Sequence, residues 1–141
     1  MNKKKKRLSG VSMIEFALLL PILLLLLVGI VDISVLLLDK AIITNASREG
    51  ARYGVVLRQP TYATMVSIAA YTKSYCDNKL ISFTSPAPQV TVIATPSSPA
   101  PQFGDTLSVS VSYVYTDLML HYFINHSQQY TLNATTVMMY E

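Results

Sequence analysis

Glu15 is the residue whose chemistry the sequence makes hardest to explain. It stands in GVSMIEFALLLP (residues 10–21), at the start of an apolar run that continues to Leu38. Five basic residues, Lys3 to Lys6 and Arg7, lie immediately upstream. Because burying an unpaired carboxylate at a membrane edge is unfavourable, any role for Glu15 must suit both the basic cluster and a helix in lipid.

The other residues capable of chemistry form no recognisable catalytic, cofactor or metal site. His121 and His126 are five positions apart, which fits one helical face poorly, and no further ligands cluster beside them. The serines of 107–116 alternate along a predicted strand without a His or Asp partner at a meaningful spacing. We therefore expect no enzyme activity, no metal and no cofactor. The single cysteine, Cys76, is either a small buried apolar residue or one end of an intermolecular disulfide.

The charges are distributed unevenly along the 141 residues. The net charge is +3, but the five upstream basic residues account for more than all of it. The rest of the chain has six basic and eight acidic side chains, a net charge of −2. No basic patch remains for nucleic acid. At 51% hydrophobic and 13% charged residues, the composition is apolar for a soluble domain.

The apolar run predicts a transmembrane helix. Phe16–Leu38 would extend for roughly 35 Å, which is enough for a bilayer core and too long for a cleaved signal peptide. We assign residues 1–10 to a basic leader in the cytoplasm and 11–38 to the membrane, with the C-terminal part outside the cytoplasm. Pro21 can kink this helix. Asp32 is either hydrated near the far interface or paired with a polar partner in a helix assembly.

Residues 39–59 predict an amphipathic continuation of the same helix, which ends before Pro60. Ala46, Gly50 and Gly54 form a stripe of small residues along it, where two backbones can approach closely. One interpretation is an ordinary amphipathic helix that covers its own domain. The other is a stalk whose stripe packs against neighbouring subunits.

Residues 60–141 predict a small α+β head. A second helix is expected at about 61–78, and the Pro/Ser segments at 85–88 and 95–101 are turns. Alternating or β-rich segments predict three short strands, at 89–94, 107–116 and 130–141. A short antiparallel sheet packed on the exposed part of the long helix would complete this α+β head.

The combination of motifs resembles a known family. The basic leader, Gly10 and Glu15 five positions later resemble a prepilin processing signal. GVSMIEFALLLPILLLLLVGIVDISVLL followed by NASREGARYGVV is similar to the TadE-like family of the tight-adherence (Tad) pilus system, and FGDTLSVSVSYVYT resembles that family's terminal strands. The resemblance implies a minor pilin-like protein (pseudopilin) that a prepilin peptidase cuts between Gly10 and Val11. In pilin assembly, the carboxylate at the position of Glu15 meets the new ammonium group of a neighbouring chain.

The resemblance also implies partners and a place in the cell. The expected partners are the peptidase, other pilin-like and inner-membrane Tad assembly proteins, and membrane lipid. The expected location is the bacterial inner membrane, with a periplasmic head. Phe16 stands where the system's major pilins typically have tyrosine, and those pilins lack a head, so a minor or assembly-associated subunit is implied. Two alternatives stay open: an uncleaved single-pass adaptor of a secretion or pilus complex, and a membrane-tethered enzyme.

Overall fold

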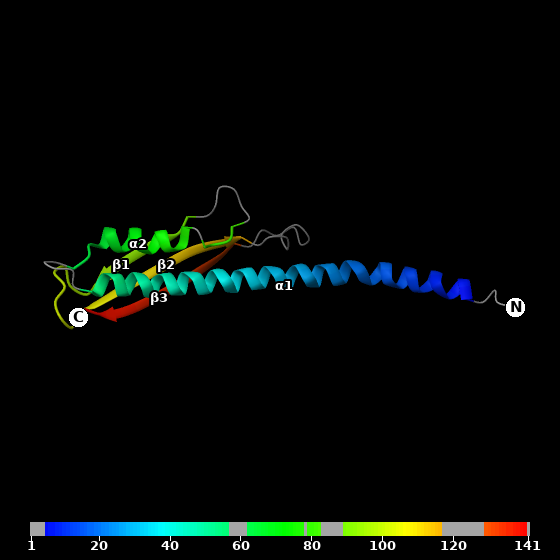
Figure 1. Ribbon diagram of the computed structural model, residues 1–141, viewed down its shortest axis with the longest axis horizontal. Coiled ribbons are helices and arrows are strands. Elements are labelled where there is room, and N and C mark those ends of the chain that lie inside the picture. Colours follow the sequence, from blue (N-terminus) through cyan, green and yellow to red (C-terminus); the bar gives the residue numbers. More distant parts are fainter. Residues whose placement is uncertain (1–4, 57–61, 78, 83–88, 117–128, 141) are drawn as a thin grey trace.

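The computed structural model describes residues 5–56, 62–77, 79–82, 89–116 and 129–140, with side chains from residue 10 onward. Its elements follow in the order α1, α2, β1, β2 and β3. One long helix carries a small head, made of α2 and the three strands, at its C-terminal end (Figure 1). The α+β prediction is therefore confirmed.

Helix α1 (Lys5–Val55) is one unbroken helix of 51 residues, about 76 Å long. The helix continues through Pro21, a residue that can break a helix. The N-terminal half projects alone from the head (Figure 1). Its leucine-rich surface is exposed on all sides. A helix that is apolar all round suits a membrane. By length and composition α1 could cross one, and it is the one such helix among the described residues.

Helix α2 (Met65–Asp77) starts where a threonine can cap it. The Thr64 hydroxyl oxygen accepts a hydrogen bond from the Ser67 N–H at 3.3 Å, the geometry of a helix N-cap. The residues that α2 buries recur every fourth position: Ile68, Thr72 and Cys76. This single face turns toward α1 and the sheet. The helix is shorter than the predicted 61–78.

The three strands form one antiparallel sheet in the order β1 (Thr91–Pro96), β2 (Thr106–Thr116) and β3 (Gln129–Met139). The central strand β2 buries each odd-numbered residue from Leu107 to Tyr115 and turns its serines away from the core, as the alternation predicted. The turn before β2 uses Gly104 at a φ of 92°, which favours glycine. The predicted strands are present, with bounds shifted by one or two residues at several ends.

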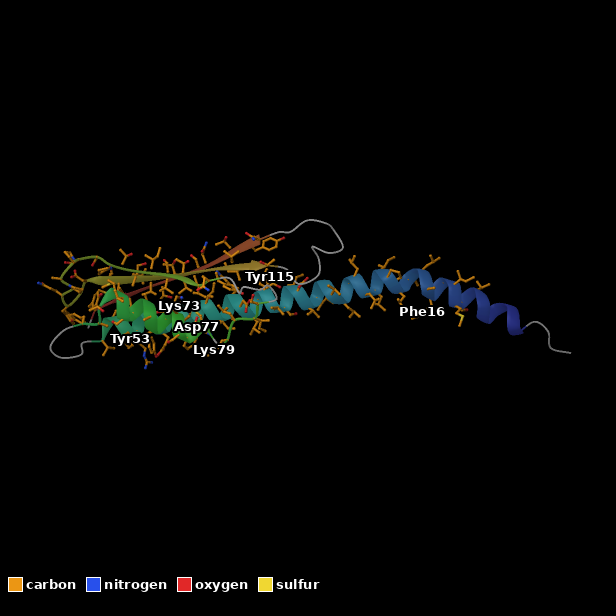
Figure 2. All side chains as sticks on the ribbon, turned by 90° about the horizontal axis from the view of Figure 1, so that it is seen from above. Phe16, Tyr53, Lys73, Asp77, Lys79 and Tyr115 are labelled. Atoms are coloured by element: carbon orange, nitrogen blue, oxygen red, sulfur yellow. The ribbon has the colours of Figure 1, made fainter. Side chains whose placement is uncertain are left out.

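Both helices cover the same face of the sheet, and Figure 2 shows the sheet lying along the packed half of α1. Polar links hold α1 to β3: Lys40 donates to the carbonyl oxygen of Asn133, and the hydroxyls of Ser47 and Thr136 lie 2.8 Å apart. The rings of Tyr53 and Tyr71 stack with centroids 4.3 Å apart and join α1 to α2. Hydrogen bonds and aromatic contacts thus reinforce the apolar core.

The head packs on α1 from Asp32 onward, earlier than the sequence predicted. On α1 the buried positions follow the helical period along one face: Asp32, Asp39, Ile43, Ala46, Ser47, Gly50, Ala51, Gly54 and Val55. On this face, contact with the head therefore begins within the expected membrane segment 11–38, whose bounds stay a prediction. Residues 11–31 are the part of α1 that is left free for lipid.

Candidate processing, membrane and assembly site

Gly10 lies on the free half of α1, in a helical backbone that begins five residues earlier. A side chain added at Gly10 would meet nothing within 4 Å. Glycine in a helix interior costs about 1 kcal/mol relative to alanine. No contact within the chain explains why glycine precedes Val11, which is itself exposed.

Glu15 and Phe16 lie one turn beyond Gly10 on the same free segment. Figure 2 places Phe16 far from the head, and both side chains are exposed. Val11 and Glu15 are four positions apart, so they share one face of the helix. The structure therefore brings the two residues of the expected cut and the carboxylate together on a surface that the head leaves uncovered.

Asp32 lies where the head first covers α1. It is only 3% exposed, because the end of β2 covers it. The Tyr115 hydroxyl donates a hydrogen bond to the backbone carbonyl oxygen of Asp32 at 3.3 Å (Figure 2 labels Tyr115). The chain's own head covers this residue, and its role in assembly stays a prediction.

Asp39 is a buried acid that the sequence analysis missed. It is fully buried, and one carboxylate oxygen accepts a hydrogen bond from the N–H of Ile81 at 3.1 Å. The other oxygen has no hydrogen-bond partner among the described residues. Asp39 thus ties α1 to the segment that follows α2. Its spacing of seven from Asp32, which puts both acids on one helical face, is the signal that could have found it.

Burial raises the pKa of Asp39 above its ordinary value of 3.8, and the hydrogen bond from Ile81 acts in the opposite direction. As pH rises above 3.8, the carboxyl ionises in the unfolded chain before it ionises in the folded one. Stability should therefore fall between 3.8 and the folded-state pKa, and stay lower above it.

We expect Asp39→Asn to remove this dependence on pH. Asparagine keeps an acceptor for the Ile81 N–H but cannot ionise. The melting temperature of the variant, relative to that of the parent at the same pH, should increase as pH rises from 3.8 to neutral. Thermal unfolding of the detergent-solubilised chain, followed by near-UV circular dichroism of its tyrosines, measures it. A difference that is constant over this range would show that Asp39 ionises normally.

The stripe of small residues faces the chain's own head. Ala46 is fully buried in the core with Ile43 and Cys76. A β-carbon at Gly50 would overlap Thr72 of α2, and one at Gly54 would overlap Ile68 of α2 and Leu107 of β2. The stripe does allow close helix packing, but with α2, so the structure supports the interpretation of an ordinary helix that covers its own domain. The interpretation of a stripe packed against neighbouring subunits is corrected here, because α2 and β2 already fill the space beside both glycines.

The remaining sequence candidates add no chemistry to the described residues. Cys76 is fully buried, and burial raises the pKa of its thiol to about 11, as expected for a small core residue. In the described part of the chain, no group of three or more His, Cys, Asp or Glu side chains could hold a metal ion. His121 and His126 lie outside the described residues.

Comparison with known proteins finds a similarity that covers the free half of α1 from Gly10 onward and most of its packed half. A family model described as "TadE-like protein" matches residues 10–52. The match starts at Gly10, includes Glu15, Asp32 and Asp39, and ends within α1, so α2 and the sheet lie beyond it. Neither the comparison with curated proteins nor that with solved structures gave a match. The resemblance drawn from the sequence is confirmed over residues 10–52, where the chain is similar to the TadE-like family.

Proposed function

We propose that the chain is a minor pilin-like subunit (a pseudopilin) that takes part in the assembly or initiation of a tight-adherence pilus. The TadE-like match supports the connection with this pilus system. A prepilin peptidase cuts between Gly10 and Val11, α1 anchors the product in the bacterial inner membrane, and the head lies in the periplasm. Other pilin-like and inner-membrane Tad proteins are its partners, and its role is structural rather than enzymatic.

The observation that carries this proposal is the surrounding of Gly10. It is exposed, it has open space around it, and it lies on a segment that the head does not touch. A glycine with no packing role in its own chain is explained when an outside protein must fit closely against the backbone at that point. A peptidase that reads the residue before the scissile bond is such a protein.

Glu15 adds a second argument. Its carboxylate is exposed on a helix surface that is otherwise apolar, so insertion of that surface into lipid or into a helix assembly leaves a charge to be neutralised. Cutting before Val11 creates an ammonium group within one helical turn of this position. It also removes the five basic charges of the leader, which bind the helix end to the cytoplasmic membrane surface.

Replacing Gly10 with leucine should block processing. The bulky side chain has ample room within the chain, so the head should fold normally, and only the fit to the peptidase is lost. Intact mass spectrometry of the protein purified from its host measures the outcome: the variant should keep residues 1–10, and the parent should begin at Val11. Gly29→Leu is the matched control, because Gly29 also has open space on the same helix and lies far from the cut.

The same measurement separates the proposal from its alternatives. An uncleaved membrane adaptor would retain residues 1–10 in the parent as well. If the Gly10→Leu protein still begins at Val11, the prepilin assignment is wrong. A membrane-tethered enzyme would instead reveal itself by a head variant that loses an activity while pili still assemble. Immunogold labelling of sheared pili then distinguishes a subunit of the fibre from one that stays in the membrane.

A further inference from the structure

One end of the sheet lies beside the point where α1 leaves the head. Tyr115, near the end of β2, is 2% exposed and donates its hydrogen bond to the carbonyl oxygen of Asp32. Tyr130, at the start of β3, is the direct partner of Tyr115 across the β2–β3 ladder. Directly opposed residues have Cα atoms about 5.5 Å apart or less and side chains on the same face. Tyr130 therefore lies at about the same level as Asp32 along the axis of α1.

The length of α1 that the head leaves uncovered places the level of Asp32 at the outer edge of a bilayer. Residues 11–31, at about 1.5 Å each, span roughly 31 Å, while a bilayer core is about 30 Å thick. Headgroup regions add about 5–7 Å on each side, which corresponds to the next three to five residues of a helix. Asp32 and Ile33 thus fall within the outer headgroup region, and so does the end of the sheet that packs on Asp32.

The side chains at this end suit that region. Tyr130 is 47% exposed although its partner Tyr115 is buried, so much of its ring faces away from the core. Tyrosine is enriched at membrane interfaces, since its ring is apolar and its hydroxyl is polar. On α1, Ile33, which follows Asp32, is 59% exposed.

No charge on the strands opposes such a contact. The strand sequences TVIATP, TLSVSVSYVYT and QYTLNATTVMM contain no Asp, Glu, Lys or Arg. The charged residues described after Lys40 lie elsewhere. Arg48, Glu49 and Arg52 are on α1, and Lys73, Asp77 and Lys79 are on α2 or just after it. Asp105 lies at the far end of the sheet. The described strand residues at the near end of the sheet can therefore enter the headgroup region without burying a charge of their own.

We propose that the Tyr130 end of the sheet rests in the phospholipid headgroup region of the outer leaflet. This inference rests on the membrane anchoring that is part of the proposed function. Helix and sheet then contact the same bilayer, and the second contact fixes the tilt of the head relative to the membrane. The head stands upright, with β3 running away from the lipid.

Single-tryptophan variants test the contact, because the chain contains no tryptophan of its own. Three full-length variants, Tyr130→Trp, Phe103→Trp and Leu24→Trp, are reconstituted in phosphatidylcholine vesicles whose acyl chains are brominated near the headgroup. Phe103 is 86% exposed beside the Gly104 turn, at the opposite end of the sheet. Leu24 lies on the free helix. Bromine quenches only tryptophans that reach the lipid.

We expect the tryptophan of Tyr130→Trp to be quenched several-fold more than that of Phe103→Trp. Its fluorescence should also have its maximum at a shorter wavelength. Gln129→Trp, at an exposed neighbouring position, should repeat the result without any change to the core. Equal quenching of Tyr130→Trp and Phe103→Trp, with strong quenching of Leu24→Trp, overturns the contact but leaves the anchor intact. A blue shift without quenching overturns it as well, because it means that protein covers the tyrosine. No quenching of Leu24→Trp overturns the anchor together with the contact.

Discussion

Gly50→Ala should destabilise the head by about 2 kcal/mol, although alanine is the better helix former. The exchange gains about 1 kcal/mol in helix propensity. Against this, a β-carbon at position 50 would lie 3.1 Å from the Cβ and 3.2 Å from the Cγ2 of Thr72, and closer still to its Oγ1. Overpacking a tight core costs about 1–3 kcal/mol, and this site belongs at the upper end of the range.

The reason is that Thr72 cannot turn away. Its hydroxyl donates a hydrogen bond to the carbonyl oxygen of Ile68 at 2.7 Å, and its other branch is nearly as close to Gly50. Rotation about χ1 would exchange one close contact for another, so α1 and α2 must separate. Denaturant unfolding of the detergent-solubilised chain, followed by the near-UV signal of its tyrosines, measures the loss.

Three further variants show whether the close approach of α1 and α2 is the cause. Gly29→Ala is the matched control, because nothing lies within 4 Å of its new methyl group, and the head should keep the stability of the parent. Thr72→Ala combined with Gly50→Ala should recover part of the lost stability, since contacting residues are not additive. Gly54→Ala should cost less, because its nearest neighbours are terminal methyl groups of Ile68 and Leu107, which can move. A Gly50→Ala head as stable as the parent would mean that the helices are not in close contact there.

The sequence could predict that Gly50 and Gly54 allow close packing, but not against which chain. Spacing shows that small residues share a helical face, and any second helix can use that face. The face is used by α2, which joins α1 through Thr72 and through the stacked rings of Tyr53 and Tyr71. These contacts join residues more than fifteen positions apart, and no local pattern records them. The strand β2, by contrast, was predictable because its alternation of serine and apolar residues is a local property.

The contact of the head with the last part of the apolar run could not be predicted, for a related reason. The apolar run continues to Leu38, because α1 is apolar on both sides from residue 33 to 38 except at Ser34. Val35 and Leu36 are half-buried against the core of the head, while Ile33 and Leu37 remain exposed. An apolar residue that faces protein and one that faces lipid look alike in a sequence. Only Asp32 differed, and its burial depends on Tyr115, which follows it by 83 positions.

Glu15→Gln should abolish assembly while leaving the chain folded, inserted and processed. Glutamine keeps the shape of the side chain and removes its charge, so insertion into the membrane should be at least as favourable as for the parent. Glu15 lies on the free half of α1, away from the head, so the stability of the head should not change. Cleavage should be largely retained if the peptidase reads mainly Gly10 and the basic leader. The loss must then arise where chains meet.

The expected physical cause is the ammonium group that the proposed processing would create on Val11. Among apolar helices, a charge is weakly screened, and removing one partner of a buried pair costs about 3–5 kcal/mol because the other charge is left unpaired. Glu15→Asp, which keeps the charge on a side chain one methylene shorter, should assemble to an intermediate degree. The yield of pilus, or of the chain's membrane complex, from cells that express each variant at equal level measures the effect. Full assembly of Glu15→Gln chains that begin at Val11 would show that the carboxylate pairs with no neighbour, and the basis of the proposed assembly role would be lost.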